Sequence, residues 1–154
     1  MEKSKQEYID ILNKLIEINH CRVEIYEQAA KEADGPTMKY LFTRLAENSR
    51  SCRDELWFEI KKLGGTPREG VSSAGKTFST WMKVKIALSN KNRKMILNCC
   101  SNGEDVNIKM YEDILTIMED AFEEHYRLIE KQHAMLKADH NRIKNIGMAF
   151  VKFN

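Results

Sequence analysis

The sequence has 154 residues, a length that suits one domain with a single hydrophobic core. Hydrophobic residues make up 42% and charged residues 31%, with 7 Gly and 2 Pro, which excludes disordered, collagen-like and transmembrane classes. The 25 Lys and Arg and 23 Asp and Glu leave a formal net charge of +2, with both signs interspersed along the chain. No basic surface for nucleic acid is therefore indicated.

The N-terminal segment 1–12 is charged and lacks the apolar run of a signal peptide, so we expect a cytoplasmic protein that does not bind a membrane. The cysteines lack the C-x-x-C spacing of zinc and redox sites. In a reducing compartment their simplest interpretation is as free thiols. They are Cys21, Cys52, Cys99 and Cys100.

The first half of the chain predicts a helical hairpin. Apolar residues at helical spacing indicate a helix over about 4–33, which Asp34-Gly35-Pro36 ends. Pro36 suits the first turn of the next helix, because the N–H that proline lacks would have no partner there. That second helix covers about 37–63, and Gly64-Gly65-Thr66-Pro67 stops it.

The second half predicts a short crossover helix over about 73–88 and two more long helices, over about 91–118 and 121–147. No Gly or Pro lies between Asn107 and Gly147. One continuous helix from Asn90 would nevertheless be about 85 Å long, too long for this domain. We therefore place a turn near 119–121. The expected fold is a single all-α domain over 1–154, an antiparallel four-helix bundle with a short crossover helix between the second and third long helices.

Several short strings, in order, resemble an uncharacterised bacterial four-helix-bundle family of the ferritin-like superfamily, a domain of unknown function. The resemblance spans about 12–146 and implies a ferritin-like fold but no activity. The strings are Leu12-Asn13-x-Leu15-Ile16-Glu17, Tyr26, Ala29-Ala30, Leu41-Phe42, Glu55-Leu56, Leu63-Gly64-Gly65-x-Pro67, Gly75, Trp81, Lys85, Ile96-Leu97, Cys100, Gly103-Glu104-Asp105, Tyr111, Gln132 and His140.

The chain departs from that family pattern at several positions. Cys21-Arg22 stands where the family tends to have Asp-Gly, Ser101 where it has Glu, Phe78-Ser79 where it has His-Arg, and Asn141 where it has Asp. Several of these exchanges remove carboxylates. They weaken the expectation of an acidic site in the bundle.

A ferritin-like bundle raises a di-iron hypothesis, since such centres use Glu and Glu-x-x-His ligands that converge on the bundle axis. Glu17-x-x-His20 and Glu130-x-x-His133 match that spacing. The helical wheel directs the first match to solvent and places the second, with His140, on or near the apolar stripe. On the third long helix Gly103 and Asn107 lie at the centre and Glu104 at the edge.

Three functions remain open from the sequence. The first is a non-catalytic structural, stress-related or protein-binding module, either a homo-oligomer or bound to a protein partner, with no cofactor expected. The second is a metal-binding protein or oxidoreductase that holds iron, zinc or copper on His133, His140, Glu130 and Glu104, with further ligands from Glu24, Glu27, Glu47 or Glu55. The third is a copper-handling or redox thiol protein that uses the four cysteines. We favour the first, which is not an enzyme.

Overall fold

The computed structural model describes residues 2–69, 76–90, 92–118 and 123–153. They form five helices and, within these ranges, no strand: α1 (Glu2–Glu32), α2 (Pro36–Lys62), α3 (Lys76–Asn90), α4 (Arg93–Met118) and α5 (Glu123–Phe153). The predicted turn near 119–121 lies outside the described residues. The predicted end of the last helix near Gly147 differs from the structure, in which α5 continues to Phe153. A mid-helix glycine costs only about 1 kcal/mol relative to alanine, so one glycine does not stop a helix.

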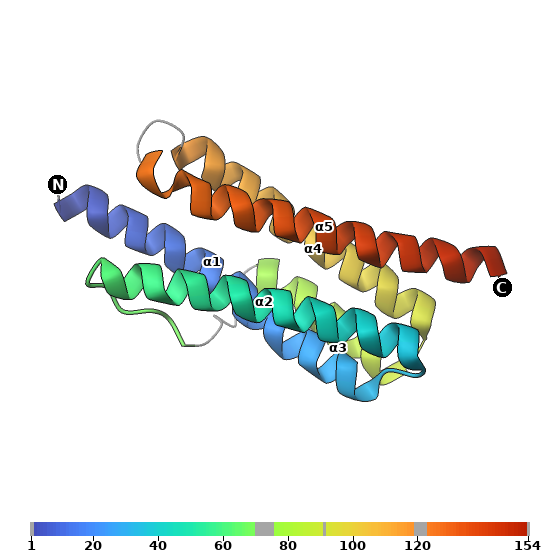
Figure 1. Cartoon of the computed structure of the whole chain (residues 1–154). Coiled ribbons are helices and arrows are strands. Elements are labelled where there is room, and N and C mark those ends of the chain that lie inside the picture. The colour runs from blue at the N-terminus through green and yellow to red at the C-terminus, as the bar shows by residue number, and fades with distance from the viewer. Residues whose placement is uncertain (1, 70–75, 91, 119–122, 154) are drawn as a thin grey trace.

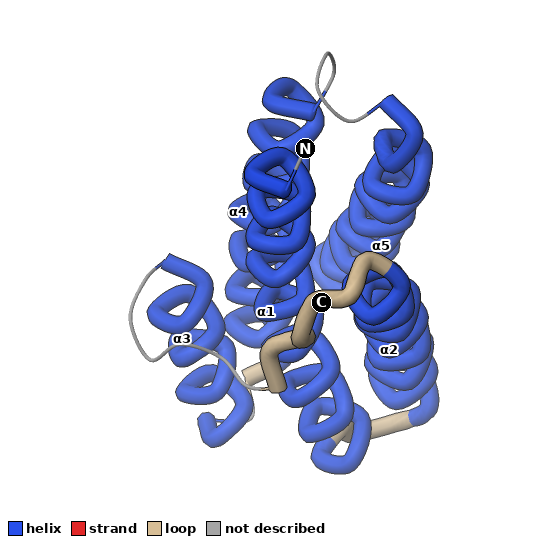
Figure 2. The backbone as a smooth tube through the Cα atoms, turned by 90° about the vertical axis from the view of Figure 1, so that its left-hand side faces the viewer, coloured by secondary structure: helices blue, strands red, loops and turns tan. Residues whose placement is uncertain are grey.

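The four long helices form an antiparallel bundle of two hairpins. In Figure 1, α1 and α2 lie side by side as one hairpin, and α4 and α5 as the other. Contacts of α2 with α5 and of α1 with α4 join the hairpins. The shorter α3 packs against α4 and α1 on the outside of the bundle (Figure 2). No helix among the described residues has the length and apolar character needed to cross a membrane.

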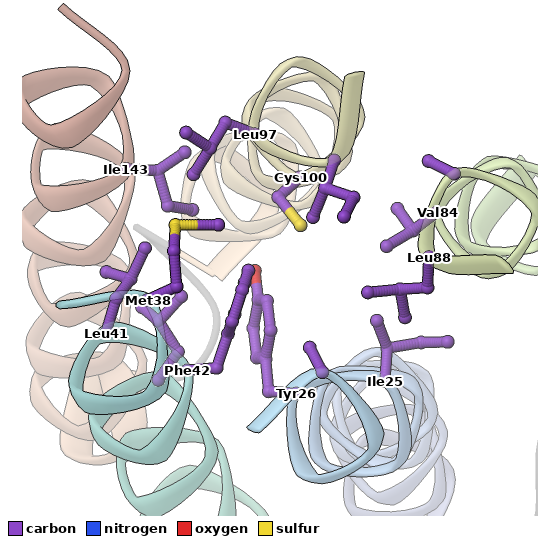
Figure 3. Packing of buried hydrophobic residues seen from close by; sticks show 14 of the residues in the cluster. Ile25, Tyr26, Met38, Leu41, Phe42, Val84, Leu88, Leu97, Cys100 and Ile143 are labelled. Carbon is purple, nitrogen blue, oxygen red and sulfur yellow. The ribbon is translucent and has the colours of Figure 1, made fainter. Parts of the chain in front are cut away.

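Two hydrophobic cores lie one after the other along the bundle. The α3-side core takes residues from all five helices, and Figure 3 labels ten of them, including Tyr26 and Phe42, whose stacked rings have centroids 6.3 Å apart. The distal core is built from the four long helices, with residues such as Leu12, Leu56 and Leu136. On α1 the α3-side core begins at Cys21 and the distal core ends at Ile18. The residues between them are polar.

Candidate functional site

A layer of buried polar side chains separates the two cores, and we call it the polar layer. Each of its members is 0% exposed, and together they come from α1, α2, α4 and α5. Buried polar groups are costly unless they are hydrogen-bonded, so such a layer indicates specific pairing across the helices. The members are Asn19, Arg22, Ser49, Glu104, Asn107, Gln132 and Asp139.

Arg22 on α1 occupies the centre of this layer. Its Nε lies 2.8 Å from Oε1 of Glu104 on α4, and its Nη2 lies 2.8 Å from Oδ2 of Asp139 on α5. Its Nη1 donates to Oδ1 of Asn19 at 2.9 Å. Burial alone lowers the pKa of the guanidinium, but the negative charges of Glu104 and Asp139 help to raise that pKa well above its ordinary value. A fixed positive charge therefore joins the two hairpins.

Three further donors form hydrogen bonds with the carboxylates of Glu104 and Asp139. The hydroxyl of Tyr26 donates to Glu104 Oε1 at 2.5 Å, and burial, together with the negative charge of Glu104, raises the pKa of Tyr26 well above its ordinary value. Nδ2 of Asn48 and Nη1 of Arg142 donate to Asp139 Oδ1 at 2.7 and 2.9 Å. Together with those from Arg22, these make five hydrogen bonds to the two acids, and all are charge-assisted because a carboxylate accepts each.

A chain of neutral hydrogen bonds extends the polar layer into the distal core. Asn19 donates to the hydroxyl of Tyr111 at 2.8 Å, and that hydroxyl donates to Oε1 of Gln132 at 2.8 Å. Nε2 of Gln132 donates to the carbonyl oxygen of Cys52 at 3.0 Å. Among the described residues, Oε2 of Glu104 and the side-chain amide of Asn107 are buried without a hydrogen-bond partner.

The structure separates the four metal ligands predicted from the sequence. Glu104 is fully buried at the centre of α4, not at its edge, and is paired with Arg22. His140 contacts Asp105 at 2.9 Å and Ser101 at 3.2 Å, both on α4. His133 pairs with Glu112 at 3.1 Å, and Glu130 is exposed. Among the described residues, no group of three or more His, Cys, Asp or Glu side chains is arranged to hold a metal ion.

Among the additional predicted ligands, Glu55 reaches the polar layer, where its Oε1 accepts from Nε2 of Gln132 at 3.4 Å. Glu24 pairs with Lys85, Glu27 with Arg50 and Glu55 with Lys131, and Glu47 is exposed. All six charges of these three pairs are at least partly exposed to solvent. Surface pairs of this kind contribute little to stability, about 0–1 kcal/mol each.

The cysteines do not form a common site. Cys21, Cys52 and Cys100 are buried, while Cys99 is half-buried. Burial raises the pKa of Cys21 and of Cys52 to about 12 and that of Cys100 further. Since the thiolate is the reactive and metal-binding form, these three environments disfavour thiol chemistry at neutral pH.

Sequence reasoning missed Arg22 and Asp139, which organise the layer. Both follow the helical spacing of the buried faces: Arg22 lies three residues after Asn19, and Asp139 three after Leu136. That spacing was the available signal, but charged residues are ordinarily assigned to the surface. Their burial depends on partners far along the chain.

Comparison with known proteins places this architecture in a family. The model of the family described as "Domain of unknown function (DUF2383)" matches residues 7–117. The chain belongs to this family. The resemblance and the ferritin-like all-α fold expected from the sequence are thereby confirmed, and the family name itself assigns no activity.

A solved structure supports the same fold for this DUF2383 protein. It is the crystal structure of ferritin-like, diiron-carboxylate proteins from Bacillus anthracis, with a TM-score of 0.68 and 18% sequence identity. The alignment covers 97% of this chain and 99% of that one. No curated protein matches the sequence. At this identity the similarity shows the fold alone.

The polar layer of this DUF2383 protein does not fit a di-iron centre. The two acids that reach the layer, Glu104 and Asp139, both already bind the guanidinium of Arg22 at 2.8 Å. A di-iron centre needs several carboxylates and two histidines around the ions, whereas His133 and His140 pair with acids on α4 outside the layer. A cation bound among these residues would also have to share two carboxylates with a buried positive charge.

Proposed function

We propose that this DUF2383 protein is a ferritin-like bundle without a complete di-iron centre, and that it works as a structural or protein-binding module through its surface. The observation that carries this proposal is the position of Arg22, whose guanidinium binds both acids of the polar layer. A cation that belongs to the chain itself is thus already paired with both Glu104 and Asp139. The interior then serves to hold the two hairpins together.

The alternative is a metal-binding protein that uses Glu104, His133, His140 and Glu130. It draws support from one feature of the polar layer, since Glu104 Oε2 and Asn107 Oδ1 are buried acceptors without a partner among the described residues. Oxygen acceptors of this type bind hard cations. The proposal and the alternative give opposite results in one experiment.

That experiment is iron loading of the purified full chain. The protein is mixed with Fe(II) without oxygen, freed of unbound iron on a desalting column and measured by elemental analysis. We expect far less than one iron per chain, because both acids of the polar layer are already paired with Arg22, and Asp139 is also paired with Arg142. Stoichiometric iron that is lost in Glu104→Gln but kept in the exposed control Glu130→Gln would overturn the proposal and place the metal in the polar layer.

A further inference from the structure

The loop that follows α2 is held against α1 by three polar side chains. Asn13 Oδ1 accepts from the backbone N–H of Arg68 at 2.8 Å, and Nδ2 of Asn13 donates to the carbonyl oxygen of Thr66 at 3.3 Å. Nε2 of His20 donates to the carbonyl oxygen of Arg68 at 2.9 Å. Oε2 of Glu17 lies 3.1 Å from Nη1 of Arg68. Glu17 and His20, which the helical wheel directed to solvent, therefore contact this loop.

These three residues share one face of α1, since they lie four and three positions apart. Asn13 and His20 form hydrogen bonds with the backbone of Arg68, and Glu17 pairs with its side chain. Both the backbone and the side chain of this arginine are therefore held. The glycines before it permit the close approach: Gly64 has a φ of 83°, and a Cβ on Gly65 would lie 2.9 Å from the side chain of Ile9. Arg68 is thus held in place while its side chain stays 50% exposed.

A hollow of about 480 Å³ lies beside this arginine, between the loop and α2. Trp57 and Phe58 line it and remain 41% and 67% exposed. Their rings meet edge to face, with centroids 5.4 Å apart. Exposed aromatic rings beside arginine are the residue types that contribute most of the binding energy at protein interfaces.

The charges around the hollow leave guanidinium groups available to a ligand. Among the described residues, nothing engages Nη2 of Arg68 or the Nη atoms of Arg53, whose Nε lies 3.4 Å from Oδ1 of Asp54. Asp54 and Glu69 also line the hollow, so two acids lie beside its two arginines. The free nitrogen atoms are donors in a planar arrangement that matches a carboxylate.

We propose that this hollow binds an acidic segment of a partner protein, with a carboxylate on Arg68 and an apolar side chain covering Trp57 and Phe58. A protein segment fits better than a small molecule, because ligand pockets enclose most of their ligand and the ring of Phe58 is 67% exposed. The fixed position of Arg68 lowers the entropy cost of binding. This inference rests on the protein-binding role proposed above and names its surface.

The test uses the full chain labelled with ¹⁵N and two short capped peptides. One alternates Glu with Leu and Phe, and the other has Lys in place of every Glu. We expect the Glu peptide to shift the indole N–H signal of Trp57 and the amide signal of Arg68 in a saturable way, and the Lys peptide to leave both unchanged. The Trp57→Phe variant identifies the indole signal against that of Trp81.

Two variants, each with a matched control, assign the contacts. Arg68→Gln and Phe58→Ser should each weaken binding of the Glu peptide about tenfold, the effect of losing one charge-assisted or one aromatic contact. Arg44→Gln and Tyr40→Ser change exposed residues of the same types on α2 outside the hollow. They should leave the affinity unchanged.

Three results would overturn the inference: no shift at Trp57 with the Glu peptide, equal binding of the Lys peptide, or a dimer in sedimentation that Phe58→Ser abolishes. The last would assign the surface to a second copy of the chain. None of these three results contradicts the proposed function. Stoichiometric iron in the polar layer would contradict it.

Discussion

Arg22 is stabilised in the interior by its partners and by their geometry. Its three nitrogen atoms each meet an oxygen on a different side chain, at 2.8, 2.8 and 2.9 Å. Burying a charged group costs several kcal/mol, which only a well-placed counter-charge and full hydrogen bonding offset. Removing one of these side chains therefore leaves a buried charge unpaired, and the stability lost exceeds that of the removed hydrogen bond alone.

We expect Arg22→Met to lower the free energy of unfolding by about 3–5 kcal/mol, because Glu104 and Asp139 lose the buried cation that is paired with both. Urea denaturation followed by circular dichroism measures this. Replacing Glu104 and Asp139 by Leu in the same variant should recover part of the loss. Arg50→Met, which removes an arginine paired at the surface with Glu27, should cost less than about 1 kcal/mol. Equal stability of Arg22→Met and wild type would contradict the assigned role of the layer.

At the scale of the helices, the ends of the first two helices were predictable from the sequence because local residues determine them. The signals at Gly35-Pro36 and Gly64-Gly65 mark the ends of α1 and α2. For α4, hydrophobicity alone centred the buried face on Gly103 and Asn107. In the structure Gly103 and Asn107 are buried as expected, and Glu104 and Tyr111 are buried beside them.

The burial of Glu104 on α4 has a physical cause. Glu104 faces inward because Arg22, on another helix and 82 positions away, supplies the opposite charge. A periodicity argument considers one helix at a time, so it places Glu104 only at the edge of the buried face. The same reasoning could not find the contacts of Glu17 and His20 with Arg68, which depend on where a loop returns along α1.

The attachment of this loop can be tested by amide hydrogen exchange. We expect Asn13→Ala to speed exchange of the Arg68 amide about tenfold, because that N–H loses its acceptor at 2.8 Å. Lys14→Ala, an exposed change at the next position of α1, should have no effect. Unchanged exchange in Asn13→Ala would mean that other contacts fix the loop.

At the scale of the whole molecule, several thiol and phenol side chains are buried in or beside the two apolar cores. Burial raises the pKa of Cys21 and of Cys52 from 9.0 to about 12, and it raises those of Tyr8, Tyr26 and Tyr111 from 10.0. A group with a raised pKa in the folded state contributes stability that is present below its unfolded pKa. That stability is lost as the pH rises toward the folded pKa.

We therefore expect the bundle to lose stability above about pH 9, by up to about 1.4 kcal/mol per pH unit for each buried thiol until pH 12. Urea midpoints measured at neutral pH and at pH 10 give the effect. The double variant Cys21→Ala, Cys52→Ala should lose less stability over the same interval. A midpoint that stays constant between the two pH values would contradict the burial of these groups.

The placement of charges in the polar layer also bears on the order of synthesis. Arg22 belongs to the first hairpin, whereas Glu104 and Asp139 belong to the second. As the chain leaves the ribosome, α1 and α2 emerge with a guanidinium on the side they will later bury, and no acid of the layer is yet available. Burying that charge before its acids are present would be costly. Arg22 can pair with both acids only after α5 has been made.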